Sequence, residues 1–86
     1  MQKDYLKVKI FWMPLTKEVF YEGEALSVSS KNQLGKFDIL PKHTNFITLI
    51  FDELSIVTLK GEKITYRFKR GVLEVRKNKV NIYLGL

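Results

Sequence analysis

Hydrophobic and polar residues alternate with a period of two along most of this chain. Near the start, every second residue is apolar, and lysines occupy two of the positions between them. The apolar residues of this parity are Leu6, Val8, Ile10 and Trp12. A strand with one buried and one solvated face has this pattern, because successive side chains point to opposite faces of a sheet. The first predicted strand therefore spans 6–12 and ends before Pro14, which lacks the amide hydrogen that a ladder requires.

The same alternation divides the rest of the chain into further short strands. We expect turns at Gly23, 29–33, Asp52–Glu53, Arg70–Gly71 and 77–79, and strands over 18–22, 26–28, 37–40, 46–51, 54–59, 64–69, 72–75 and 80–84. Within 26–28, Leu26 and Val28 are predicted to face the core. Strands at intervals of roughly 8 to 12 residues, without helical periodicity, predict an all-β fold: an antiparallel β-sandwich or flattened barrel of short strands with no substantial helix.

Length and composition describe one small globular domain. The 86 residues are 45% hydrophobic and 28% charged, with no cysteine to form disulfides or thiolate metal sites. The longest apolar run, 46–51, is far shorter than the ~20 residues that a spanning helix needs. The first residues lack the apolar stretch of a signal peptide. We therefore expect a cytoplasmic protein without direct membrane insertion.

The net charge of +6 could indicate a polyanionic partner. The cations form small clusters along the whole chain, however, as on the solvated faces of strands. Tyr66 and Phe68 alternate with Arg67 and Lys69, as on small barrels that stack single strands, but they share the parity of Ile64, which favours the core. A small basic β-barrel that binds single-stranded nucleic acid is thus one alternative function, and an accessory domain of another complex is a second.

Candidate catalytic and metal-binding residues are few. His43 is the only histidine, and no second histidine or cysteine stands at a ligand spacing from it. Glu22 and Glu24 flank Gly23, where nothing apolar is present to raise the pKa of one carboxyl for acid catalysis. The glycines are scattered singly and form no phosphate loop. We therefore predict no catalytic, cofactor-binding or metal site, and a protein that is not an enzyme.

Three short motifs follow one another in a fixed order. They are Tyr21-Glu22-Gly23-Glu24, then Gly35-x-Phe37 with Leu40-Pro41-x-His43, then Gly71-Val72-Leu73-Glu74-Val75 with Asn78-x-Val80. This set resembles the amino-terminal domain of the epsilon subunit of F-type ATP synthases, over nearly the whole chain. The resemblance implies a single epsilon-type β-sandwich domain over 1–86, placed in the central stalk between the gamma subunit and the ring of c subunits.

The resemblance also implies a mechanical function. The domain would be a non-catalytic rotor subunit that links gamma to the c-ring and couples ion translocation to ATP synthesis, as a peripheral part of the complex on the cytoplasmic face of the cell membrane. The family pattern assigns the c-ring-facing segment to Lys36, Phe37, Asp38, Pro41, Lys42 and His43. The gamma-facing candidates are Phe11, Trp12, Met13, Leu15 and Thr48, with a place in the core equally open for Trp12.

The chain departs from this family pattern at its central segment and at its end. Asp38 and Lys42 stand where glycines are usual, and Lys36 replaces a common Glu. Two lysines would repel the usual basic loop of a c subunit, so either that loop is acidic or Asp38 provides the negative charge while the lysines point to solvent. The chain stops at Leu86, where the family continues into a helical hairpin that inhibits ATP hydrolysis, so we expect neither inhibition nor ATP binding.

Overall fold

A computed structural model describes residues 4–12 and 19–86. This part of the chain contains no helix and consists of strands β1 (Leu6–Trp12), β2 (Val19–Asn32), β3 (Gly35–Ile39), β4 (Phe46–Thr58), β5 (Lys63–Arg76) and β6 (Lys79–Leu84). The predicted all-β fold class is confirmed. Accordingly, no helix within the described ranges could span a membrane.

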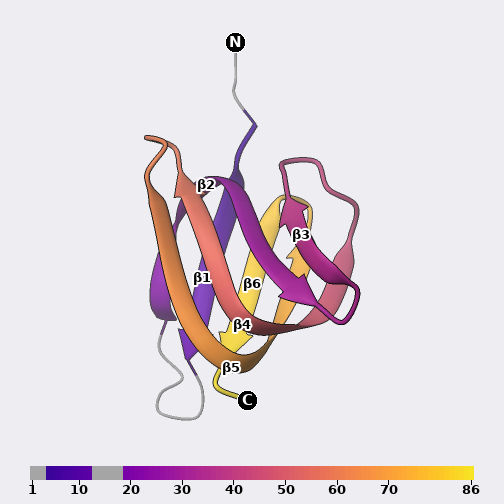
Figure 1. Ribbon diagram of the computed structural model, residues 1–86. Coiled ribbons are helices and arrows are strands. Elements are labelled where there is room, and N and C mark those ends of the chain that lie inside the picture. Colours follow the sequence, from indigo (N-terminus) through magenta and orange to yellow (C-terminus); the bar gives the residue numbers. More distant parts are fainter. Residues whose placement is uncertain (1–3, 13–18) are drawn as a thin grey trace.

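The strands close into a flattened barrel (Figure 1). Neighbours in the order β1-β6-β5-β4-β2 are hydrogen bonded, and β2 pairs back with β1, so these five strands form a ring. β3 pairs with the second half of β2, on the edge whose first half pairs with β1. Every pairing is antiparallel except the parallel pair β1–β6. Ring closure removes most of the free strand edges that would otherwise invite aggregation.

Three strands are longer than the alternation predicts. The bend expected at Gly23 and residues 29–32 of the loop expected at 29–33 lie inside β2, and only Gln33 of that loop falls in the β2–β3 turn; the turn expected at Asp52–Glu53 lies inside β4, and the turn expected at Arg70–Gly71 lies inside β5. These turn predictions were wrong. The 13- or 14-residue strands run on and bend, so that each takes part in both layers of the flattened barrel.

Bulges explain why continuous strands look interrupted in the sequence. Leu26 in β2 and Lys69 in β5 are extra residues without a register partner. Each bulge exchanges the buried and exposed parities of its strand. In β2 the buried positions pass from Ala25 to Val28, and Leu26, which was predicted to face the core, is only half-buried. A change of parity inside one strand has the same pattern as two strands separated by a turn.

Gly71 follows the bulge in β5 at a point of close backbone approach. A Cβ atom built there would lie 2.6 Å from the carbonyl oxygen of Tyr83 and 2.9 Å from a methyl carbon of Leu84. Gly23 is also confined, but there a Cβ would meet the hydroxyl of Tyr21 at 2.7 Å, and a tyrosine side chain can move. Position 71 therefore requires glycine, whereas at position 23 a shift of the Tyr21 side chain could make room for a Cβ atom.

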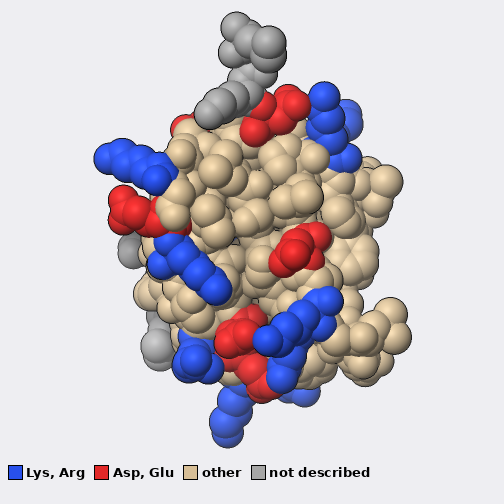
Figure 2. Space-filling view, turned by 45° about the horizontal axis from the view of Figure 1, so that its top comes forward, with Lys and Arg blue, Asp and Glu red and all other residues tan. Residues whose placement is uncertain are grey.

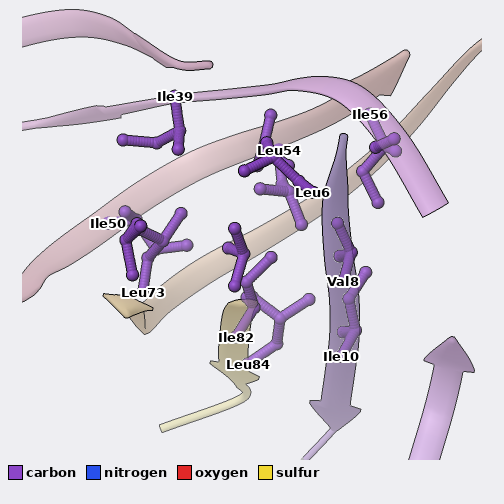
Figure 3. Packing of buried hydrophobic residues seen from close by; sticks show 14 residues of the cluster. Leu6, Val8, Ile10, Ile39, Ile50, Leu54, Ile56, Leu73, Ile82 and Leu84 are labelled. Carbon is purple, nitrogen blue, oxygen red and sulfur yellow. The ribbon is translucent and has the colours of Figure 1, made fainter. Parts of the chain in front are cut away.

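The core fills the space between the two layers (Figure 3). Inward side chains of all six strands meet there, and the fully buried members include Leu6, Val8, Ile10, Val28, Ile39, Ile50, Leu54, Ile56, Leu73, Val75, Val80, Ile82 and Leu84. The buried hydroxyl of Ser30 donates to the carbonyl oxygen of Glu53 at 2.6 Å, and no buried side-chain nitrogen or oxygen of residues 4–12 and 19–86 lacks a hydrogen-bond partner. Tyr66 and Phe68 pack against this core, as their parity predicts.

Candidate functional site

A row of apolar side chains crosses the outer surface of four neighbouring strands. Phe11 of β1 is in register with Tyr83 of β6, Tyr83 with Val72 of β5, and Val72 with Leu49 of β4. Their neighbours along each strand point into the core, so these four point outward. We call this set the apolar row.

Several residues of this surface are unusually exposed for their type. Leu49 is 46% exposed, and Ile47, two residues earlier on the same face, is 67% exposed. The rings of Phe11 and Tyr83 stack with centroids 5.3 Å apart and planes 11° apart. Stacking holds both rings in place without a partner, and a contiguous apolar surface with fixed aromatic groups is typical of a protein contact site.

A second row, on the opposite layer, is polar. Asp38 of β3, Ser29 of β2, Ser55 of β4 and Thr65 of β5 are in register across their strands. Ser29 donates to Asp38 at 2.6 Å, and the hydroxyls of Ser55 and Thr65 lie 3.0 Å apart. We call this set the polar row. Figure 2 shows that uncharged side chains fill much of this side of the barrel, with most charged groups toward its rim.

The structure divides the predicted c-ring-facing segment between a strand and a loop. Lys36, Phe37 and Asp38 belong to β3, with Phe37 packed against the core and the other two pointing outward. Pro41, Lys42 and His43 belong to the loop that follows, as the predicted strand-loop-strand order requires. Lys36 therefore lies near the start of β3 and Lys42 follows its end, so the two lysines do not form one charged cluster.

Contacts with other elements hold this loop in place. The Lys42 ammonium lies 3.2 Å from the Asp4 carboxylate, and the Lys42 amide donates to the side-chain oxygen of Asn78 at 2.6 Å. Asn78 also accepts the amide of Lys7 on its backbone carbonyl at 2.8 Å. Its φ of 62° fits the left-handed turn predicted for 77–79. The loop, the start of β1 and the β5–β6 turn thus form one connected corner.

The gamma-facing candidates fall into three groups. Phe11 points outward in the apolar row, whereas Trp12 points inward opposite Leu84 and packs edge-on against Phe20 at 5.3 Å. Thr48 is half-buried, shares the inward parity of β4, and accepts a hydrogen bond from Asn32 at 3.3 Å. The other two candidates, Met13 and Leu15, lie outside the described residues.

Sequence reasoning missed three members of the apolar row. Leu49, Val72 and Tyr83 are apolar residues that stand next to core residues, so the local sequence does not mark them as outward. One signal for them is present in the sequence, because the run 46–51 is apolar at both parities although one parity of an outer strand is usually polar. That excess of apolar residues indicates a surface that a partner covers.

The described residues form no cluster suited to hold a metal ion. Glu22 and Glu24 both point to the outer surface, and the Glu22 carboxylate lies 3.9 Å from the Lys9 ammonium. The raised pKa values of Tyr66 and Lys31 follow from packing and from an ion pair within the fold. Burial raises the pKa of the Tyr66 phenol, and a hydrogen bond from Lys31 to Asp52 raises the pKa of that lysine. These groups offer contact surfaces rather than a constellation for chemistry.

Comparison with known families decides the assignment of this fold. Residues 15–84 match the family model of the ATP synthase delta/epsilon chain β-sandwich domain. The chain belongs to this family. The resemblance inferred from the three motifs is thereby confirmed, and the Tyr-Glu-Gly element acquires a physical reason, since the side chain of Tyr21 occupies the space that Gly23 leaves free.

Curated relatives agree with this membership. The chain is 33% identical over 67 residues to the ATP synthase epsilon chain of Clostridium novyi, covering 77% of this chain and 51% of the relative. It is 36% identical over 67 residues to that of Xylella fastidiosa, covering 77% of this chain and 47% of the relative. The chain thus spans about half the length of the curated relatives it matches.

Solved structures show the same fold. A chain in the cryo-EM structure of the Euglena gracilis mitochondrial ATP synthase, OSCP/F1/c-ring in rotational state 1, superposes with a TM-score of 0.84 at 14% identity, covering 95% of this chain and 51% of that one. A chain in the Tetrahymena thermophila mitochondrial ATP synthase central stalk/c-ring structure gives 0.71 at 16% identity, covering 98% and 66%. The β-sandwich is therefore shared across distant sequences.

Proposed function

We propose that this domain is a non-catalytic rotor subunit of an F-type ATP synthase. It links the gamma subunit to the c-ring, and so couples ion translocation to ATP synthesis. Membership of the delta/epsilon family supports the complex, and relatives named ATP synthase epsilon chain support the subunit. The domain is then a peripheral part of a membrane-associated complex, on the cytoplasmic face.

The apolar row carries this proposal and assigns the gamma-binding surface. A free monomer gains nothing by exposing Leu49 and Ile47 beside stacked aromatic rings, whereas a partner that covers them removes that area from water. Tyrosine is enriched among residues that dominate binding energy, because its ring is large and its hydroxyl tolerates a wet rim. Tyr83 at the centre of the row is therefore the expected anchor.

The loop 40–45 is the proposed contact with the c-ring. It lies at the end of the barrel opposite the carboxy terminus (Figure 1) and presents Leu40, which is 56% exposed. Lys42 is locally compensated by Asp4, and Asp38 is engaged by Ser29. Of the two lysines in the proposed segment, Lys36 makes no ion pair with a described residue. The loop therefore needs no acidic group on a c subunit opposite Lys42, and an acidic group opposite Lys36 is expected only where the contact extends along β3 to its start.

Single-strand binding, the alternative function, has little support in the structure. Stacking of bases requires aromatic faces on the wet surface, beside cations. Tyr66 and Phe68 instead pack against the core, while Arg67 points outward and lies 3.7 Å from the Glu53 carboxylate. The aromatic and basic side chains of β5 therefore occupy opposite faces, and no stacking platform forms there.

Calorimetric titration of gamma into the domain tests the proposed function. Burial of the apolar row predicts a negative heat-capacity change and an affinity that weakens less with salt than phosphate-driven binding does. A labelled single-stranded oligonucleotide in the same salt series is the control, since phosphate-driven binding weakens steeply with salt. Absence of gamma binding, together with salt-sensitive oligonucleotide binding, would reverse the assignment.

A further inference from the structure

A second outward row lies on the same outer surface as the apolar row, four residues away along each strand. Lys7 of β1 is in register with Lys79 of β6, and Lys79 with Arg76 of β5. All three side chains are exposed. We call this set the cationic row. A strand rises ~3.3 Å per residue, so the two rows are separated by roughly 13 Å.

The cationic row has no ion-pair partner among residues 4–12 and 19–86. Glu24 is opposite Lys7 in the register but accepts a hydrogen bond from the Tyr5 hydroxyl, which raises the pKa of that phenol. The next outward lysine, Lys9, differs because its ammonium lies 3.9 Å from Glu22. Glu74, two residues before Arg76 on the same outward face, also forms no ion pair with the row. Three neighbouring cations without an ion-pair partner repel one another, and a carboxylate brought between them would relieve that repulsion.

An open groove runs beside this row. Its volume is ≈ 610 Å³, and Lys7, Lys9, Lys79 and Asn81 line it together with the Glu22–Glu24 stretch of β2. Lys7 and Lys79 of the cationic row line the groove, which leaves room for a side chain from another protein next to their ammonium groups. Both the charge and the free space therefore favour an acidic side chain as the occupant.

We propose that the gamma subunit places one or more carboxylates over Lys7, Lys79 and Arg76 while apolar side chains cover the apolar row. This inference rests on the proposed function. Two contacts of different chemistry, roughly 13 Å apart, fix the orientation of the domain on its partner, because neither row can exchange places with the other. The cationic row thus sets the register of docking and accelerates encounter, while the apolar row supplies most of the affinity.

Association kinetics with purified gamma test this division of roles. The test variant is Lys7→Glu with Lys79→Glu, and the matched control is Lys60→Glu with Lys63→Glu, which makes the same change of charge at exposed positions by the β4–β5 turn. We expect the test variant to lower the association rate constant at least tenfold at low salt, with the deficit shrinking at high salt. The control should change it by less than threefold.

Four outcomes would overturn the proposal, and they differ from one another. Equal slowing by both double variants would show an effect of net charge alone. An unchanged rate for the test variant, with binding abolished by Leu49→Asp, would remove the cationic row and leave the proposed function intact. Absence of wild-type binding would remove both. Carbodiimide coupling of Lys7 or Lys79 to a gamma carboxylate gives independent support, and coupling to a c subunit instead would reassign the row.

Discussion

The apolar row and the polar row share two strands, β4 and β5, and differ in the outward residues that those strands present. β4 contributes Leu49 to the first and Ser55 to the second, and β5 contributes Val72 and Thr65. Both rows cross four strands in register over one shared core. In the polar row the hydroxyls hydrogen bond to their neighbours, whereas the apolar row leaves hydrocarbon in water.

This difference separates what the fold requires from what a partner requires. Inward side chains pack against the core along both halves of β4 and β5, so the fold does not demand an outward leucine at position 49. The half of each strand that carries the polar row shows that serine and threonine suffice on the outer face. Apolar outward residues on the other half therefore indicate contact with a partner.

Gly71→Ala is expected to have the largest effect, because it disrupts the bend through which β5 joins the two layers. Its Cβ would lie 2.6 Å from a backbone oxygen, and we expect a loss of about 3 kcal/mol in unfolding free energy by urea denaturation. Gly61→Ala is the control. That site is open but has a φ of 85°, so its cost should be about 1 kcal/mol. Equal costs would contradict the account of the bend.

The gamma affinities of Leu49→Asp, in the apolar row, and Thr65→Asp, in the polar row, test which of the two rows gamma contacts. The first should weaken gamma binding by about 2 kcal/mol or more, roughly thirtyfold, because a desolvated carboxylate replaces apolar contact. The second should leave the affinity unchanged, since its position faces away from the apolar row. Both positions point outward, so thermal melting should confirm that both variants remain folded. Comparable weakening by the two variants would mean that gamma does not distinguish the rows.

Thr65→Val removes the hydroxyl contact with Ser55 and extends apolar surface into the polar row. An exposed neutral hydrogen bond contributes little, and valine has good strand propensity, so the unfolding free energy should change by less than about 0.5 kcal/mol. Gamma affinity should stay the same. A gain in gamma affinity would show that exposed apolar area alone, and not its position, governs docking.

Asp52→Asn has the smallest expected effect, at the rim of the polar face. Asp52 has a φ of 73°, which asparagine tolerates, so the backbone should be unchanged. The hydrogen bond and charge of Asp52 raise the pKa of Lys31, so this pair stabilises the fold below the ordinary lysine pKa and loses that contribution as pH rises through the raised value. NMR titration of the Lys31 ammonium should show a lower pKa in the variant. An unchanged pKa would exclude Asp52 as the cause.

The period-two alternation was sufficient to predict the inward residues of β1 and β6 and the left-handed turn at Asn78, because each depends on local residue types. It failed at 29–32 and at Asp52–Glu53, where polar residues continue a strand. Ladder hydrogen bonds to neighbouring strands hold those segments extended, and such partners are distant in sequence.

The candidate surface was predicted only in part for a related reason. Phe11 could be found from its position beside an inward strand residue, but Leu49, Val72 and Tyr83 become neighbours only when β4, β5, β6 and β1 are aligned. Trp12 and Thr48 were predicted to contact gamma, yet both stand at inward positions of their strands, which places them toward the core. Register, which a single sequence does not specify, decides both results.

Alkylation of single introduced cysteines tests the central claim most directly, since the chain has no cysteine of its own. Leu49→Cys and Thr65→Cys place one thiol in each row, and their rates of reaction with N-ethylmaleimide can be measured with and without gamma. Burial of the apolar row predicts that gamma slows alkylation at position 49 at least tenfold and leaves position 65 unchanged. Protection at position 65 with free reaction at position 49 would contradict the account.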